Sequence, residues 1–189
     1  LKSCALHGVD GLIVNVEVDI SDGLPCFDLV GLPDSSVRES KERVRSAIRN
    51  SGYPFPVKRI TINLAPADYK KEGSYYDLPI AIGILCCMGL IEQDSLDSCL
   101  IAGELSLDGN IRDVKGILPI VCAAKSNHLK ECLIPIKNAA EGSLVEGIDI
   151  IGLTSLQQAI LHLKGDSLSP TVRVKVKKQC KSSSNSLDF

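Results

Sequence analysis

The chain has 189 residues, of which 44% are hydrophobic, 23% charged and 4% aromatic, and its formal net charge is -2. This composition is typical of globular proteins and excludes fibrous, collagen-like and disordered classes. A chain of this length buries about 70% of its unfolded surface, so its core needs neither disulfides nor a metal. The longest apolar stretch, residues 78–91, is interrupted by one proline and two glycines. It is shorter than the roughly 18 apolar residues of a membrane span, and we expect no membrane association.

Charge is distributed unevenly along the chain. Residues 167–189 contain five lysines and arginines against one aspartate, whereas the preceding residues are acidic overall. The same segment is rich in serine, which is typical of linkers. We therefore expect a folded body over residues 1–166 and a basic Ser/Lys-rich linker over residues 167–189.

The eight cysteines show no metal-binding pattern. None are spaced as Cys-x2-Cys, and most lie among aliphatic residues, where a free thiol behaves as a small hydrophobic group. Abundant free thiols without a secretory leader indicate a reducing cytoplasm. Because the sequence begins with leucine rather than methionine, we expect it to be a fragment of a longer chain.

Hairpins dominate the predicted first half of the chain. Residues 12–20 alternate apolar and polar side chains with period two, which indicates a strand with one buried face. The turn at residues 8–11 joins this strand to a preceding one. In chain order, this half is predicted to contain strands at residues 2–7, 12–20 and 27–30, a helix that Asp34 or Ser35 caps and that ends near Asn50, a strand at residues 57–64 and an apolar helix at residues 77–90.

Strands and helices alternate in the predicted second half. Its elements are a hairpin of residues 100–107 and 111–114, a helix at 117–127, a strand at 132–136, a short helix at 138–145, a strand at 148–152 and a helix at 155–163. Valine alternates with basic residues at 172–178, which indicates either a strand at the sheet edge or a basic tether. Together the two halves predict an α+β, or mixed α/β, domain.

Seven basic residues form a candidate DNA-contacting surface. Three of them are spaced four residues apart in the helix that ends near Asn50, so they share one helix face. Such a cluster can neutralise phosphates. The alternative is a solvated helix face, because glutamates are interspersed among the cations. The candidate residues are Lys41, Arg45, Arg49, Lys58, Arg59, Lys70 and Lys71.

The usual nucleotide-binding motifs are missing from the sequence. It contains neither Gly-x4-Gly-Lys-Ser/Thr nor Gly-x-Gly-x-x-Gly after a predicted strand. The three histidines are scattered and are more typical of surface or core residues than of ligands. We therefore expect no catalytic, cofactor-binding or metal-binding residue in this chain.

Two segments, Lys70–Ala81 and Ala102–Arg112, resemble the signature regions of the Lon protease proteolytic domain. In that family the first region carries a nucleophilic serine and the second leads to a catalytic lysine. On this pattern the two positions fall on Tyr75 and Leu118, so the resemblance implies that the dyad is lost. Ser74 and Lys115 lie close to those positions in sequence, and a residual serine protease of Lon type that uses Ser74 is the alternative.

A longer likeness covers residues 3–165. The motifs at residues 8–11, 17–25, 30–34, 39–48, 63–68 and 71–79 resemble the N-terminal domain of the Mg-chelatase-like ComM family of AAA+ ATPases. This resemblance implies a Lon-protease-like fold, also described as ribosomal protein S5 domain 2-like, that serves as a non-catalytic domain of a larger protein.

The same resemblance implies what the parent protein does. It would be a hexameric, ATP-driven motor that acts on branched DNA in natural transformation and recombination, with ATP and Mg2+ bound in a separate ATPase domain. The present domain would contribute DNA contact and homo-oligomeric ring assembly in the cytoplasm. A further alternative is an accessory domain of a metal chelatase, although Asp34, Asp68 and Asp77 are typical of caps or turns rather than of a metal site.

Overall fold

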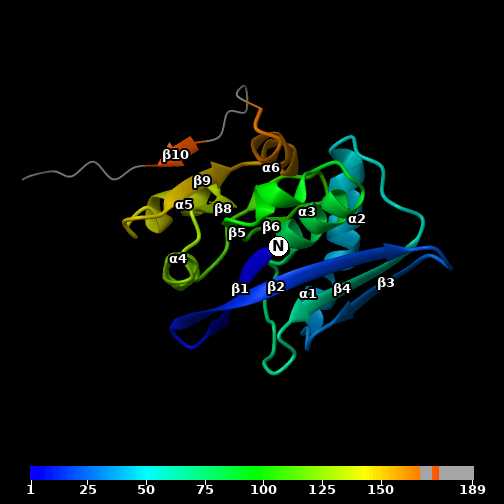
Figure 1. Ribbon diagram of the computed structural model, residues 1–189, viewed down its shortest axis with the longest axis horizontal. Coiled ribbons are helices and arrows are strands. Elements are labelled where there is room, and N and C mark those ends of the chain that lie inside the picture. The colour runs from blue at the N-terminus through cyan, green and yellow to red at the C-terminus, as the bar shows by residue number, and fades with distance from the viewer. Residues whose placement is uncertain (167–171, 175–189) are drawn as a thin grey trace, which may run out of the picture.

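The computed structural model describes residues 1–166 and 172–174. At its centre lies an eight-stranded sheet with the order β10-β9-β8-β5-β1-β2-β4-β3 (Figure 1). The strands of this sheet are β1 (Lys2–His7), β2 (Asp10–Ser21), β3 (Cys26–Val30), β4 (Arg59–Ala65), β5 (Cys99–Ile101), β8 (Glu131–Pro135), β9 (Asp149–Leu153) and β10 (Val172–Val174). A separate ribbon pairs β6 (Glu104–Leu105) with β7 (Ile111–Arg112). The helices are α1 (Ser35–Arg38), α2 (Ser40–Asn50), α3 (Asp77–Cys87), α4 (Ile117–Ser126), α5 (Ile136–Gly142) and α6 (Leu156–Leu163), with a 3-10 helix at Gln93–Leu96.

Parallel and antiparallel pairs alternate in blocks across this sheet. The hairpin-rich first half supplies the antiparallel pairs β1–β2 and β2–β4. The strand–helix alternation of the second half supplies the parallel run β5–β8–β9, because a helix carries the chain back between successive strands. The prediction of a mixed α/β domain is therefore confirmed.

The two halves of the sheet differ in how they are covered. In β2, Val14 and Val16 are buried while the intervening Asn15 and Glu17 are exposed, so this part of the sheet has one bare polar face. In β5, by contrast, all three residues are buried. A continuous apolar run of this kind is typical of strands that are packed on both faces.

Helix α3 lies in the middle of the fold, between β2 and α2 (Figure 1). Residues 77–85 are all buried. A helix that is apolar on every side is stable only when protein surrounds it, which explains its central position. Within the described residues, no helix is long and apolar enough to cross a bilayer.

The predicted helix ending near Asn50 is two helices in the structure. Asp34 caps α1 as expected, since its Oδ1 accepts a hydrogen bond from the Val37 N–H at 2.8 Å. Glu39 then ends α1 and precedes α2, so the predicted helix is interrupted at this residue, and Lys41, Arg45 and Arg49 all lie in α2. The prediction of a single helix is wrong at this point.

The predicted strand at residues 100–107 is also divided. Residues 100–101 belong to β5 in the main sheet, whereas residues 104–105 form β6 in the ribbon. Gly103 lies between them, where its N–H donates to the Tyr75 carbonyl and its own carbonyl accepts from the Leu78 N–H. These bonds to the start of α3 replace the pairing that a continuous strand would make. The predicted turn at Asp108–Asn110 does join β6 to β7.

Residues 172–174 form β10, which pairs antiparallel with β9. For residues 172–178 the sequence predicts either an edge strand or a basic tether. The edge strand is confirmed for residues 172–174, and residues 175–178 lie outside the described part of the chain. The sheet thus extends beyond the predicted boundary at residue 166.

The backbone of β4 leaves no room for a side chain where β3 ends. Gly31 has φ +101°, and a Cβ built on it would lie 2.2 Å from the carbonyl oxygen of Leu64. A residue with a side chain fits neither the backbone angle nor the space, so glycine is required here. This contact continues the pairing of β3 with β4, which makes β3 the last strand of the sheet.

Candidate functional site

Two of the seven predicted DNA-contacting residues, Lys41 and Arg59, line the same groove. The groove follows β3, encloses about 600 Å³, and is lined by Phe27, Asp28, Leu29, Val30, Arg38, Lys41, Arg59 and Thr61. We call it the β3 groove. Arg59 lies 3.7 Å from Asp28 through its Nη2 and the carboxylate Oδ2. Arg38 and Lys41 make no ion pair with any described residue, so the groove carries an excess of positive charge.

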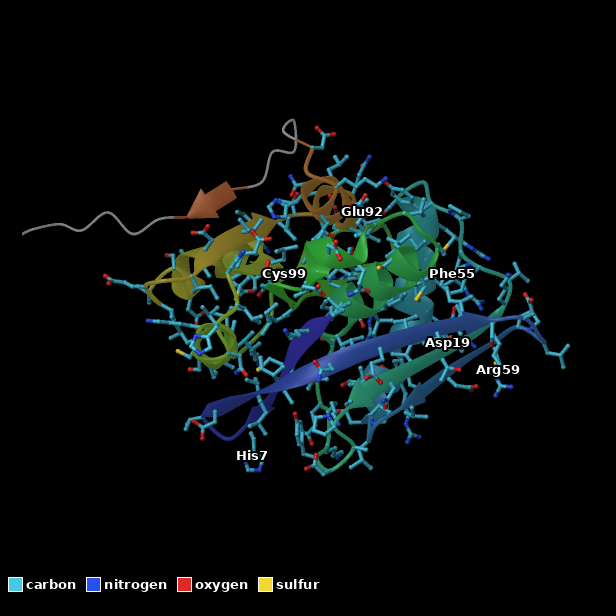
Figure 2. The ribbon with its side chains drawn as sticks, in the orientation of Figure 1. His7, Asp19, Phe55, Arg59, Glu92 and Cys99 are labelled. Carbon is cyan, nitrogen blue, oxygen red and sulfur yellow. The ribbon has the colours of Figure 1, made fainter. Side chains whose placement is uncertain are left out.

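Arg45 does not line this groove and lies in the middle of α2, one turn before Arg49. Its guanidinium carbon lies 5.4 Å from the centre of the Phe55 ring, within the range of a cation–π contact. Lys164, which follows α6, places its Nζ 5.9 Å from the centre of the ring of Tyr53, two residues before Phe55 in sequence. Figure 2 shows Phe55 on the segment beside α2, and Arg59 where β4 begins.

Arg49 completes this second group, since it is exposed in the last turn of α2. We call Arg45, Arg49 and Lys164, together with Tyr53 and Phe55, the α2-end cluster. The aromatic rings hold two of its cations in place, which reduces the side-chain entropy that these cations lose when they bind an anion.

Lys58 and Lys70 are exposed but already paired with carboxylates. The Lys58 Nζ lies 3.1 Å from Asp22 Oδ1, and the Lys70 Nζ lies 3.4 Å from Glu72 Oε1. Both pairs are open to solvent and so contribute little to stability. They also cancel the local positive charge, which weakens either lysine as a phosphate contact.

Lys71 corrects the predicted surface, because its side chain is completely buried. Its Nζ donates to the Pro66 carbonyl oxygen and lies 4.7 Å from the centre of the Tyr69 ring. Burial lowers the pKa of this ammonium group, because the charged form loses water. In this position Lys71 stabilises its own loop and cannot contact DNA.

The structure therefore divides the predicted surface into the β3 groove and the α2-end cluster. Arg38 and Lys164 were not among the predicted residues. A signal for Arg38 exists, because it precedes Lys41 by three residues in a helical region. No local signal exists for Lys164, which reaches Tyr53 from a distant part of the chain.

A second cavity contains the residues of the alternative protease reading. It encloses about 410 Å³ and is lined by Leu6, Glu72, Gly73, Ser74, Tyr75, Glu104, Asp113, Val114 and Lys115. Ser74 and Lys115 thus meet in one cavity although both are displaced from the Lon positions. Of the two residues on those positions, Tyr75 lines the cavity, and burial raises its pKa to about 12. Leu118 is not among the lining residues.

The contacts of Ser74 do not form a Ser/Lys dyad. Its Oγ donates to Oε2 of Glu104, and among the described residues it makes no hydrogen bond to Lys115. In a Ser/Lys dyad, a neutral lysine amine accepts the proton of the nucleophilic serine. Here the Ser74 hydroxyl donates to the Glu104 carboxylate instead. Glu104 could orient the hydroxyl, while the exposed Lys115 contributes positive charge at the rim.

Asp77 is not the cap or turn residue that we expected. It is completely buried at the start of α3, where Arg43 of α2 donates to it from Nε at 2.6 Å and from Nη2 at 3.1 Å. The Leu105 N–H also donates to its Oδ2, at 3.2 Å. Burial raises the pKa of this carboxyl to about 6, against the opposing effect of Arg43. The group ties α2, α3 and β6 together.

The carboxylates do not converge on a metal site. Asp34 caps α1, and Asp68 lies in the turn after β4. Across residues 1–166, no group of three or more His, Cys, Asp or Glu side chains is placed to hold a metal ion. The described residues thus provide no metal site that would support the chelatase alternative.

Comparison with known proteins identifies the family. The family described as "Subunit ChlI of Mg-chelatase" matches residues 16–138. The competence protein ComM of Haemophilus influenzae is 40% identical over 99% of this chain, and the uncharacterized protein YifB of Escherichia coli K12 is 43% identical over 85% of it. Lon protease 2 of Bacillus subtilis is 28% identical over 85% of the chain, in agreement with a Lon-like fold.

The chain spans about a third of the length of these relatives, covering 37% of ComM, 32% of YifB and 32% of Lon protease 2. The ChlI match includes β3, β4, α3 and the β6–β7 ribbon, and therefore every lining residue of the two cavities except Leu6. Its extent, together with the identity to ComM and YifB over most of the chain, shows that this chain belongs to the Mg-chelatase-like ComM family.

Proposed function

We propose that this chain is a non-catalytic, Lon-like domain of an ATP-driven DNA motor, in which it contacts DNA and helps to assemble a hexameric ring. Membership of the ComM family supports the assignment of the parent as an ATPase. The parent would act in branch migration during transformation and recombination. The residues present do not fit ATP, because they include no phosphate-binding loop. ATP and Mg2+ would bind in another part of the parent.

The α2-end cluster carries the DNA-binding proposal. Arg45 and Lys164 are held against aromatic rings, and Arg49 adds a third cation without an ion pair among the described residues. Cations next to aromatic groups are typical of surfaces that bind single-stranded DNA, because they contact phosphates while rings or guanidinium planes stack on bases. Lys58 and Lys70 lack this property because carboxylates neutralise them.

Binding by one copy of the domain is expected to be weak. The net charge of the chain is -2, so its overall field does not attract DNA beyond such local clusters. Three cations neutralise few phosphates, and each contact contributes about -0.9 to the slope of log affinity against log salt. A hexameric ring would present the cluster six times, and the high effective concentration would convert weak contacts into strong binding.

Fluorescence anisotropy with single-stranded and forked DNA at low and moderate salt tests this proposal. We expect a variant with Arg45→Ala, Arg49→Ala and Lys164→Ala to bind about tenfold more weakly at low salt, with a shallower salt slope. The matched control carries Lys58→Ala, Lys70→Ala and Lys125→Ala, which removes the same charge elsewhere, and it should bind like the unmodified chain. Equal binding by the two triple variants would contradict the proposed interface.

The expected setting is the cytoplasm. The seven cysteines of the described residues are all free thiols, which is typical of proteins in a reducing compartment.

A residual serine hydrolase is the second candidate, because Ser74 and Lys115 line one cavity. A fluorophosphonate probe and a peptide-cleavage assay, each with Ser74→Ala as control, separate the two functions. We expect neither labelling nor cleavage, since Ser74 donates to a carboxylate rather than to a neutral amine. Labelling that disappears in the Ser74→Ala variant would establish the hydrolase instead.

A further inference from the structure

Strand β3 ends the sheet, and its outer edge has no neighbouring strand in the described part of the chain. On its inner side, five residues of β3 pair in register with β4 from Cys26–Arg59 to Val30–Asn63. An edge strand leaves every second peptide group without a ladder partner, and these groups can pair with another extended chain.

The usual protections of an edge strand are missing from β3. It contains no proline or lysine, and its pairing with β4 runs without a bulge. Its one charged side chain, Asp28, lies beside Arg59. Val30 is 47% exposed at the end of the strand. The edge is therefore open and regular over the length of β3, which is about 17 Å for five residues.

The β3 groove lies along this edge, because four consecutive residues of β3 line it. Cations stand around it: Arg38 and Lys41 from the helices after β3, and Arg59 from β4. Asp28 offsets one of these charges, which leaves a positive surface around a row of backbone donors and acceptors. A nucleic acid would meet the cations, but it could not pair in register with the peptide groups.

We propose that the β3 groove binds an extended segment of a partner protein that carries acidic side chains, and that this segment pairs with β3 as an additional strand. Main-chain hydrogen bonds to β3 supply the part of the affinity that does not depend on the sequence of the segment. Attraction between its carboxylates and the cations of the groove makes the groove select acidic segments. This inference goes beyond the proposed DNA contact, which uses the α2-end cluster and no residue of this groove.

The probe for the experiment is an acetylated and amidated peptide of four Val-Glu repeats, and a peptide of four Val-Lys repeats is its control. Amide hydrogen exchange of the full chain, followed by NMR, reports which backbone groups become paired. We expect the acidic peptide to slow exchange of those amides in Cys26–Val30 that exchange fast in the free chain, and the basic peptide to leave them unchanged.

Two variants separate specific docking from general charge. Lys41→Glu with Arg59→Glu reverses two cations of the groove and should weaken binding of the acidic peptide about tenfold. Lys125→Glu reverses an exposed lysine on α4 and should leave it unchanged. Retained α-helical circular dichroism in both variants shows that each still folds.

The proposal would be overturned by no protection of β3 amides, by equal binding of the acidic and basic peptides, or by equal binding by the groove variant and the control. A single-stranded oligonucleotide that binds the groove more tightly than the acidic peptide, without protecting β3 amides, would also overturn it. These results would not decide whether the α2-end cluster binds DNA, because the variants that test DNA binding change other residues.

Discussion

The buried carboxyl of Asp77 gives this domain a measurable pH dependence of stability. Burial raises its pKa from 3.8 to about 6 in the folded chain, whereas the unfolded chain exposes it to water. As the pH rises from about 4 to about 6, the unfolded state releases this proton first, so the contribution of Asp77 to stability decreases. Above about pH 7 the contribution is constant, because Asp77 is then ionised in both states.

The size of the effect follows from the pKa shift. A shift of about two units corresponds to about 3 kcal/mol, at 1.36 kcal/mol per unit. Asp77 is completely buried, so solvent screening does not reduce this figure. Glu104 raises the pKa further, while the two bonds from Arg43 and the Leu105 N–H lower it. The direction in which stability changes with pH therefore shows whether burial of the carboxylate or its ion pair with Arg43 has the larger effect on the pKa of Asp77.

The Asp77→Asn variant isolates this group. The amide cannot titrate, and its NH2 places a donor opposite a donor of Arg43 or Leu105, so we expect the variant to be less stable at every pH. The free energy of unfolding should differ between original and variant by about 2.4 kcal/mol more at pH 4 than at pH 7, because at pH 4 the unfolded carboxyl is already partly ionised.

Urea unfolding followed by circular dichroism suits this measurement, because the chain contains no tryptophan. Subtracting the variant from the original at each pH removes the titration of all other groups. A difference that is constant, or that grows toward pH 7, would refute the reasoning. It would mean that the ion pair with Arg43 outweighs the cost of burying the carboxylate.

Three further changes have expected outcomes. Gly31→Ala should destabilise the fold by about 2 kcal/mol or more in urea unfolding, because the new Cβ would lie 2.2 Å from a carbonyl oxygen at a backbone angle that disfavours alanine; a smaller loss would contradict the close approach of β3 and β4. Ser155→Ala should cost about 1 kcal/mol, since the Ser155 hydroxyl caps α6, and Ser155→Thr should restore most of it. With a thiol reagent at pH 8, the exposed Cys122 should react within minutes, whereas Cys4, whose pKa burial raises to about 12, should react only on unfolding; rapid reaction of both would contradict the packing of β1.

Local patterns in the sequence were sufficient for most of the fold. The alternation in residues 12–20 predicts the half-buried β2, and the apolar residues after Asp77 predict the buried helix α3. The errors fall where tertiary contacts override a local pattern. The strand predicted at residues 100–107 breaks at Gly103 because its backbone groups bond to residues at the start of α3.

The candidate sites were harder to predict for the same reason. Lys70 and Lys71 are adjacent and look equivalent, yet Lys71 is buried because its N–H donates to the Leu32 carbonyl and draws its loop toward α1. Asp77 and Arg43 pair across 34 positions of sequence. Partners that are far apart along the chain leave no spacing that a single sequence can reveal.

The pairing of β10 with β9 has a geometric consequence. β10 and β3 are the two outermost strands of the sheet, and seven strand spacings of about 4.8 Å separate them by roughly 34 Å. A short segment bound at β3 is therefore too far away to contact a molecule bound at β10. The two edges of the sheet can therefore bind separate molecules. A force on either edge strand is transmitted to the other through the hydrogen-bonded strands between them.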